Sequence, residues 1–406
     1  MGDLLKKVIK VFIFCIIFVG FTYFFWKNPT ITNKIAVTIT DVVDDFTSSK
    51  VNPYTRDYKI NRLQITVSDY YYNKLNDNQK KIYDSIAVSV SNFENESKVK
   101  EYEYTDIDST MNDVSEAMNA FFSDHPEVFY LNTQYKVSTV ENFSGTKLIV
   151  YLDYLVKDKN ELEQKISEIE SAMNNILNKI DNNSNDFDKE LKIHDILGEL
   201  TTYYRYTDVN SIPFECHTIY GTLISNTAVC DGFTKVMQIL LDKVNIDSII
   251  VTGYLQDQPH AWNLVKINGE WYHLDLTSDK SINGKNDSEK IIIHSYFNLT
   301  TDNIKNTHTI TYEDKIFSAN STNYNYYVYT NKSIGNNDNF ENKFKNILDN
   351  SNNSNIVEFY APKVLDVAGK IGKVLQNGKY TEYTSSNGNS FKYYNVLGTY
   401  ILLKQK

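Results

Sequence analysis

The pair Asn268-Gly269 constrains the fold of this chain more than any other short feature, because two segments rich in apolar and aromatic residues flank it. Asn-Gly is the preferred two-residue turn between antiparallel strands, since both turn positions need a positive φ. The turn pairs Ile267 with Glu270, and the alternation of side chains then predicts which residues share one face of the hairpin. They are His260, Trp262, Asp275 and Thr277.

This register predicts a carboxylate beside an imidazole. His260 would lie opposite Thr277, and Asp275 opposite Trp262, so that His260 and Asp275 are diagonal neighbours about 7–8 Å apart at the backbone. Two polar side chains can meet across that distance. The other face of the hairpin is apolar and is expected to face the core. The prediction requires a hairpin without a bulge, because one extra residue moves every side chain to the opposite face.

A second feature is the cysteine that precedes a segment of helical periodicity. Cys230 lies at or just before the first turn of the expected helix, where the helix dipole and the N–H groups favour a thiolate and lower the pKa of the thiol. A thiolate, a histidine and an orienting acid form an activated nucleophile. The N–H groups at the helix start could also bind an oxyanion. The apolar positions that define the helix are Phe233, Val236, Met237, Leu240 and Leu241.

The three pieces together resemble a known family. Val-Cys-Asp-Gly-Phe (229–233), His-Ala-Trp-Asn (260–263) and Gly-x-Trp-Tyr-x-x-Asp-x-Thr (269–277) look like the transglutaminase-like superfamily of papain-like thiol enzymes, in its bacterial membrane-anchored type. Tyr-Gly-Thr-Leu (220–223) and Tyr-Phe-Asn-Leu (296–299) also look like that core. The resemblance implies an α+β fold with a papain-like core.

The resemblance also implies the roles of the site residues. Cys230 would be the acyl-accepting nucleophile, His260 the general base and acid, and Asp275 the group that orients the histidine. Two positions depart from the family pattern. Asp231 stands where bacterial members often have Gln, and it adds an anion that opposes ionisation of the thiol. Ser278 stands where a tryptophan often follows the Asp-x-Thr element.

Three further residues are expected to bind substrate. Gln258 belongs to the loop that leads to His260 and should border the cleft, and Trp262 shares the predicted face of the histidine. Tyr220, with His217 as the alternative, is a candidate for lining the oxyanion site. The mechanism needs no organic cofactor and no metal.

Other readings of the same residues stay open. Cys216 and Cys230 could form a disulfide, which would exclude the catalytic role. Cys216-His217 with Cys230 and His260 could be a metal set, but the spacing matches no common zinc pattern. A calcium-dependent enzyme would need a carboxylate cluster, and Asp279, Asp287 and Glu289 are available for one. His125 and His194 are expected to be structural.

The amino-terminal segment predicts a membrane anchor. Lys6, Lys7 and Lys10 precede an uncharged run from Val11 to Trp26 that ends in four aromatic residues, as an interfacial belt does. The positive charges on the amino side predict that the rest of the chain lies outside the cell membrane, held by a single span. The rival interpretation is a cleaved signal peptide, but no small-residue cleavage site follows the run.

The remaining chain divides by composition and periodicity. Residues 1–27 are the expected anchor, 28–58 a polar linker, 59–186 an amino-terminal α+β domain, 187–304 the catalytic core and 305–406 a small α/β appendage. Helices are expected at 78–93, 111–122, 161–180, 189–203, 340–348 and 364–375, and strands at 63–67, 130–137, 147–154, 324–330, 356–360 and 393–403.

These observations predict an extracytoplasmic thiol acyl-transfer enzyme, a peptidase, amidase or transglutaminase. Its substrate would be surface protein or cell-wall peptide. The net charge of −10 argues against a nucleic-acid partner, which needs a basic face. The alternative is a catalytically inactive surface module of the same fold that binds peptide. It would explain Asp231 and Ser278, and it predicts an unreactive Cys230.

Overall fold

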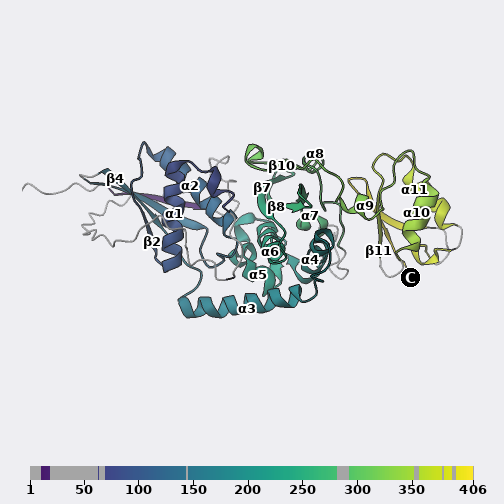
Figure 1. Cartoon of the computed structure of the whole chain (residues 1–406), viewed down its shortest axis with the longest axis horizontal. Helices are drawn as coiled ribbons and strands as arrows, with labels where there is room; N and C mark the ends of the chain where they lie inside the picture. Colours follow the sequence, from purple (N-terminus) through teal and green to yellow (C-terminus); the bar gives the residue numbers. More distant parts are fainter. Residues whose placement is uncertain are drawn as a thin grey trace, which may run out of the picture. The chain divides into compact units, whose positions relative to one another are not determined.

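A computed structural model describes residues 11–18, 63, 69–142, 145–280, 292–351, 356–376, 379–385 and 390–405. The chain forms two compact units (Figure 1), and each is described by itself. The first comprises residues 1–193, 200–263 and 307–316, and the second comprises 194–199, 264–306 and 317–406. The fold mixes helices and strands, as expected.

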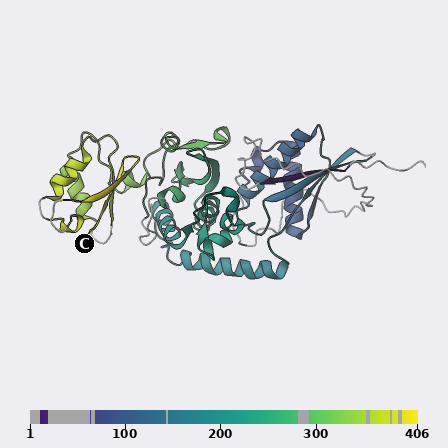
Figure 2. The ribbon, with the colours of Figure 1, turned by 180° about the vertical axis from the view of Figure 1, so that it is seen from behind.

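The first unit opens with a four-stranded antiparallel sheet in the order β1-β3-β4-β2, next to two helices (Figures 1 and 2). Both helices begin at side-chain caps, because Asn76 and Asp106 accept hydrogen bonds from N–H groups of the first turns. The predicted helices at 78–93 and 111–122 are confirmed. The elements are β1 (Val11–Phe18), α1 (Asp77–Asn92), β2 (Glu96–Val99), α2 (Ile107–Asp124), β3 (Gln134–Asn142) and β4 (Gly145–Tyr151).

The predicted membrane helix is not found in the described part of the chain. Val11–Phe18, within the predicted span, is strand β1 and pairs with β3. Among the described residues, no helix has both the length and the apolar composition needed to cross a bilayer. A short apolar run rich in β-branched and aromatic residues suits a strand as well as a helix, so periodicity alone could not separate the two. The whole of the predicted linker at 28–58 lies outside the described residues, as does the predicted strand at 63–67 except for its first residue.

The segment that follows α2 serves the fold. Asp124 is buried and accepts hydrogen bonds from the backbone N–H groups of Tyr71 and Tyr72, at 3.0 and 2.8 Å. His125 ends α2, and its Nδ1 lies 2.9 Å from Oε1 of the buried Glu127. The predicted structural role of His125 agrees with this position.

The rest of the first unit carries the cysteine and the histidine. The predicted helices at 161–180 and 189–203 are confirmed with shifted ends. Two-residue strands β5 and β6 pair in parallel, and β7 lies between β10 and β8 in the second sheet. The elements are α3 (Lys159–Leu177), α4 (Asp186–Leu200), β5 (Thr202–Tyr203), α5 (Ile219–Leu223), β6 (Thr227–Ala228), α6 (Cys230–Lys243), β7 (Ser248–Leu255), β8 (Gln258–Ile267) and β10 (His308–Ile310). Residues 194–199 of α4 and 264–267 of β8 belong to the second unit.

The second unit contains the predicted turn. Asn268 and Gly269 have φ values of 50° and 86°, so both turn positions are left-handed as expected, and β9 (Glu270–Leu274) follows. His273 and Leu299 then exchange two backbone hydrogen bonds of 2.8 Å. Two short helices, α7 (Leu276–Lys280) and α8 (Thr301–Ile304), complete this region.

The carboxyl-terminal part is a three-stranded antiparallel sheet whose core is shared with two helices. Phe344 and Ile371 from the helices pack with Phe359 of the edge strand β11. The predicted helices at 340–348 and 364–375 and the strand at 356–360 are confirmed. The elements are α9 (Tyr326–Tyr329), α10 (Phe340–Asp349), β11 (Ile356–Tyr360), α11 (Val367–Leu375), β12 (Lys392–Val396) and β13 (Thr399–Leu403).

Two predictions for this part are wrong. The expected strand at 324–330 contains the one-turn helix α9, because its many tyrosines favour strands but its backbone groups bond locally, as in Tyr329 N–H to Asn325. The expected single strand at 393–403 is a hairpin. Leu397 and Gly398 both have positive φ and form its turn, a conformation that leucine seldom adopts.

The buried Asp124 generates a prediction about stability. Burial raises the pKa of Asp124 from 3.8 to about 7, against the opposing backbone hydrogen bonds of Tyr71 and Tyr72. The folded state therefore favours the protonated acid, and its contribution to stability is full below pH 3.8 and is lost as the pH rises towards 7. In Asp124→Asn, which cannot ionise, we expect a smaller fall in the free energy of unfolding between pH 4 and 7. Urea titrations at several pH values measure the free energy of unfolding of both proteins. An equal fall in this free energy between pH 4 and 7 in both proteins would contradict the prediction.

Candidate active site

Cys230 is the first residue of α6, as the periodicity predicted. The chain reaches it through β6, which is held by β5, and through a hydrogen bond of 3.0 Å from the Val229 N–H to the Cys216 carbonyl. Val229 is the N-cap and offers no side-chain acceptor to the N–H groups of the first turn. The thiol is therefore held at the positive end of a 14-residue helix.

The glycine of the Cys-Asp-Gly sequence is required by a close approach. A Cβ atom on Gly232 would lie 2.6 Å from the Cys216 carbonyl oxygen and 2.8 Å from Thr222 Oγ1. Neither group can move away easily, because the Cys216 carbonyl is part of the backbone and the Thr222 hydroxyl is buried. Glycine at this position lets the first turn of α6 pack against the segment that carries Cys216.

One hydroxyl group joins the cysteine to the strand of the histidine. Thr234 Oγ1 lies 2.7 Å from the carbonyl oxygen of Cys230 and 3.1 Å from that of Ala261, the residue after His260. Asn263 Nδ2 donates to the Thr234 carbonyl at 3.1 Å. The structure therefore brings the predicted nucleophile and the predicted base together within the first unit, across one side chain.

The imidazole of His260 is 5% exposed and lies beside two other rings. Trp262 stacks on it with ring centroids 6.0 Å apart, and the ring of His308 lies 5.4 Å away. Trp262 is only 1% exposed, so the expected contact with substrate is not supported. Its position supports the ring of His260 instead. The alternation of side chains along β8 placed the two rings on one face correctly.

His308 was not found from the sequence. It lies on β10, opposite Leu255 of β7, and its ring also contacts Trp262 at 4.9 Å. Its Nδ1 is 2.9 Å from Thr307 Oγ1. It lies 48 residues after His260 in the sequence, inside no recognisable motif, so only the pairing of β10 with β7 brings it to the site.

The negative charge of Asp231, next to Cys230, is compensated by neighbouring side chains. Asp231 is 1% exposed; its carboxylate lies 2.9 Å from His217 Nδ1 and 3.7 Å from Lys235 Nζ. Burial alone would raise the pKa of Asp231, but the charges of His217 and Lys235 and the hydrogen bonds outweigh it and hold the pKa below 3.8. The expected opposition of Asp231 to a thiolate is therefore reduced, because a buried ammonium accompanies it. His217 lies against Asp231, which gives its ring a structural partner.

Two tyrosines beside Cys230 were also missed. Burial raises the pKa of Tyr203 and of Tyr206, and the charge of a Cys230 thiolate raises both further. Both phenols therefore keep their protons and can donate hydrogen bonds near the sulfur atom. Tyr203 owes its position to β5, which is too short to be predicted from periodicity.

Asp275 belongs to the second unit and differs from its predicted setting. Strand β9 ends at Leu274, and Thr277 lies in helix α7, so the hairpin does not extend to these residues. The strand ends because Asp275 caps the helix: its carboxylate accepts hydrogen bonds from the N–H group of Ser278, at 3.1 Å, and from the Ser278 hydroxyl. The orienting role of Asp275 towards His260 stays a prediction.

The other expected substrate contacts have different outcomes. Tyr220 donates to Glu168 of α3 at 2.6 Å, and Lys165 Nζ lies 3.8 Å from the centre of its ring. These contacts make it part of the packing of α5 on α3, and its role in binding stays a prediction. Gln258 is exposed at the first residue of β8, and the neighbouring Pro259 and His260 line a pocket. A role for Gln258 at the rim of that pocket also stays a prediction.

That pocket lies within the first unit. Its walls come from β7 and β8, from α2 and from residues 71–75 and 311–315, and its cavity volume is about 70 Å³. This is room for a few water molecules or one short side chain. Glu116 accepts a hydrogen bond of 2.6 Å from the Tyr312 hydroxyl and pairs with Lys315 Nζ at 3.1 Å, so one wall is charged.

The structure decides one of the open alternatives and describes one residue of another. Cys216 and Cys230 are both free thiols, so they do not form the disulfide that would exclude catalysis. Burial raises the pKa of the Cys216 thiol, with smaller contributions from Glu215 and Asp231. Asp279, one of the carboxylates considered for calcium, is bonded to His194, and Asp287 and Glu289 lie outside the described residues.

Comparison with known proteins agrees with this geometry. Residues 174–276 match the model of the transglutaminase-like superfamily, so the chain contains a transglutaminase-like domain. This region includes Cys230, His260 and Asp275. The predicted recognition is confirmed, and a domain of this kind supports a thiol enzyme at a coarse level. No curated protein matches the chain.

Solved structures give weaker matches. A TGase is 16% identical, with 35% of this chain and 44% of that chain covered and a TM-score of 0.25. A proposed cysteine protease from Cytophaga hutchinsonii is 18% identical, with 36% and 54% covered and a TM-score of 0.22. This chain therefore spans about half the length of the solved chains that it matches.

The shared hydroxyl of Thr234 generates a testable prediction. In Thr234→Val the one hydroxyl proton that the two buried carbonyl groups share is lost, which costs about 0.5–1.5 kcal/mol of stability, the net contribution of one hydrogen bond. It also frees the first turn of α6 from β8, so we expect Cys230 to lose most of its enhanced reactivity towards an alkylating agent.

Thr234→Ser is the matched control, because it keeps the hydroxyl group and should retain the reactivity. Circular dichroism confirms folding of both variants. A Thr234→Val protein that is folded and alkylates at the wild-type rate would show that this bridge does not position the thiol.

Proposed function

We propose that this protein is a thiol acyl-transfer enzyme in which Cys230 is the nucleophile, His260 the general base and acid, and Asp275 the orienting carboxylate. The observation that carries the proposal is the Thr234 hydroxyl, which lies within hydrogen-bond distance of the carbonyl oxygens of both Cys230 and Ala261 and shares its one proton between them. It joins a thiol at a helix start to a strand that presents a buried imidazole.

The first step transfers an acyl group to the enzyme. The Cys230 thiolate attacks a carboxamide or peptide carbonyl, a C–S bond forms, and the carbonyl oxygen becomes an oxyanion. The N–H groups at the start of α6 stabilise that oxyanion, since the helix dipole directs positive potential at it. The C–N bond then breaks as His260 gives its proton to the leaving amine. We propose that the phenol groups of Tyr203 and Tyr206, whose pKa values are raised by burial and by the charge of a Cys230 thiolate, keep their protons and stabilise negative charge on the sulfur.

The second step releases the acyl group. His260 removes a proton from the acceptor, the acceptor attacks the thioester carbonyl, and the C–S bond breaks to return the thiolate. Water as acceptor makes the enzyme a peptidase or amidase, and a lysine amine makes it a transglutaminase. Both acceptors use the same three residues.

The pocket beside His260 favours a peptide substrate. It has room for one short side chain or a small amine, and the pair of Glu116 and Lys315 supplies hydrogen-bonding partners of both charges. A binding site of this size recognises one side group of a larger molecule. We therefore propose surface protein or cell-wall peptide as substrate.

We also propose that the enzyme is held at the cell membrane with its bulk outside. The proposal rests on the sequence of residues 1–27, in which lysines precede an apolar run, although residues 11–18 of that run form strand β1 in the structure. We expect the full-length protein to stay with membranes washed at alkaline pH, and to be digested by protease added to cells with an intact membrane. Release into the wash, or protection from the protease, would contradict this location.

The reactivity of Cys230 tests the proposed chemistry. We expect iodoacetamide to alkylate Cys230 rapidly even near pH 6, because a helix start and an imidazole favour the thiolate. Peptide mass spectrometry measures the rate at each pH. Cys216, whose thiol pKa is raised by burial, is the internal control in the same sample.

Two variants separate the proposal from its alternative. His260→Asn should move the pH dependence of alkylation to that of an ordinary thiol, and Asp275→Asn should do so in part. If Cys230 reacts no faster than an ordinary thiol in the wild type, the chain is better explained as an inactive module that binds peptide.

A further inference from the structure

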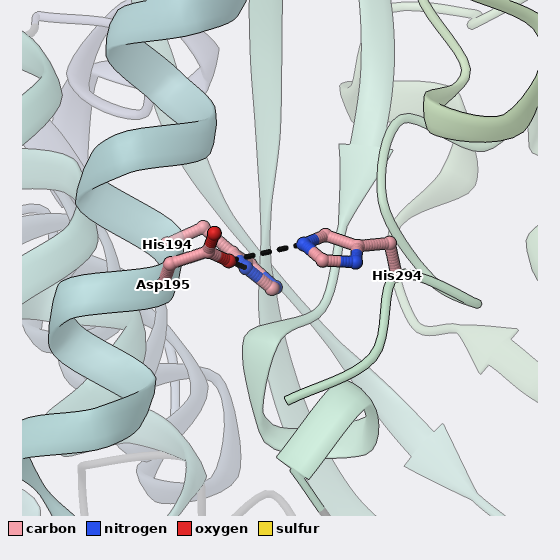
Figure 3. Close-up of side chains that lie close together, drawn as sticks. All are labelled: His194, Asp195 and His294. Carbon is pink, nitrogen blue, oxygen red and sulfur yellow. Dashed lines mark hydrogen bonds and ion pairs between the residues drawn. The ribbon is translucent and has the colours of Figure 1, made fainter. Parts of the chain in front are cut away.

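Within the second unit, five side chains form a chain of alternating carboxylates and imidazoles. His194 Nε2 lies 3.2 Å from Asp279 and His194 Nδ1 lies 3.0 Å from Asp195. His294 Nε2 lies 3.0 Å from the same Oδ1 atom of Asp195, and His294 Nδ1 lies 2.6 Å from Glu358. Figure 3 shows the His194 and Asp195 side chains close together on one helix, with a dashed line to the ring of His294.

The two outer carboxylates are fixed by other bonds. Asp279 accepts a hydrogen bond of 2.8 Å from the N–H group of Tyr296. Glu358 accepts from the Tyr327 hydroxyl at 2.9 Å and from the backbone N–H of His294 at 3.2 Å. The ring of Tyr326 stacks on His294 at 3.8 Å. The orientation of both imidazoles is therefore determined before anything binds between them.

The side chains of the cluster differ in how far they are exposed to solvent. The side chains of His194 and Asp279 are 0% exposed, and those of His294 and Glu358 are 8% and 6% exposed. Asp195 at the centre is 37% exposed. The outer ends of the chain are closed by protein, and only the central carboxylate meets solvent.

The atoms that surround Asp195 Oδ1 do not provide enough hydrogen-bond donors for their acceptors. A neutral imidazole has one N–H group and one lone pair. If the outer nitrogens donate to Asp279 and Glu358, the inner nitrogens direct lone pairs at Asp195 Oδ1, which is itself an acceptor. The three inner atoms lie within 4.8 Å of one another. Three converging lone pairs repel each other unless a positive charge lies among them.

We propose that His194 Nδ1, His294 Nε2 and the carboxylate of Asp195 bind a divalent transition-metal ion, with Zn²⁺ as the best match. Two imidazole nitrogens and one carboxylate suit Zn²⁺ and leave one position for water, which the exposure of Asp195 allows. A ligating histidine usually donates its other N–H group to a carboxylate. Asp279 and Glu358 are placed to accept those bonds.

The ion would brace the segment that carries Asp275. Asp279 lies on α7, the helix that Asp275 caps, and its backbone N–H bonds the Asp275 carbonyl at 3.2 Å. A metal at the centre would fix His194, and through it Asp279 and α7. This inference concerns the second unit alone and does not depend on the proposed reaction.

The rival state has protons in place of the metal. Burial lowers the pKa of His294, but Glu358 and Asp195 outweigh it and raise the pKa to about 10. With no cation present, the ring would carry two protons and donate to both neighbours. The two states differ in the number of protons on each ring, which can be measured.

The test uses the full untagged chain, purified without chelator. We expect elemental analysis to find a single equivalent of zinc, and chelator followed by Co²⁺ to give the visible absorption of a tetrahedral site. Added Zn²⁺ should raise the Tm of the stripped protein. Asp195→Asn and His294→Gln should abolish the binding and the Tm shift.

His273→Gln is the matched control, because this buried imidazole of the same unit bonds Thr301 Oγ1 and is outside the cluster. It should keep the metal. Spectra of ¹⁵N-labelled histidines give a second measurement that does not depend on the folding of a variant. They should show His194 and His294 as neutral rings in the zinc form. Two doubly protonated rings, with no response to Zn²⁺ or Co²⁺, would overturn the proposal and leave an ionic network.

Discussion

The hydrogen bonds of Thr234 are the interaction on which the proposed site depends. Its hydroxyl group lies between the carbonyl groups of Cys230 and Ala261, and its own carbonyl accepts from Asn263. Helix α6 is buried from Asp231 to Leu241, so these bonds form where water cannot replace them. The backbone around Cys230 is therefore held against the strand of His260 by two buried side chains, Thr234 and Asn263, which bond backbone carbonyl groups.

Burial of the helix start explains the charged residues around it. A buried carboxylate at Asp231 would be costly alone, and Lys235, one turn later, would be equally costly. Together with His217 they compensate each other, and Lys235 Nζ also bonds the His217 carbonyl at 2.9 Å. The Asp that departs from the family pattern thus comes with its own counter-charges, and the region of the thiol is not dominated by its anion.

Much of the site could be predicted because it depends on local rules. The helix start at Cys230 and the turn at Asn268-Gly269 follow from apolar spacing and from φ preferences of single residues. The sequence could not reveal His308 or Tyr203, since pairing between distant strands brings them near the histidine and the cysteine. The strand predicted at 324–330 failed for a related reason, because tyrosine-rich segments suit strands in general and local hydrogen bonds decided this one.

The position of Asp275 shows where strand register no longer predicts which side chains share a face. The alternation of side chains holds only while the strand continues, and a residue that can cap a helix competes with the next strand pair. Asp275 and Ser278 form that cap, so the carboxylate is fixed by α7 and not by a cross-strand neighbour. A cap orients its carboxylate through two bonds to one turn of helix, and α7 is in turn bonded through Asp279 to His194. The orientation of the Asp275 carboxylate therefore depends on the buried cluster that contains Asp279 and His194. No sequence motif around Asp275 indicates this dependence.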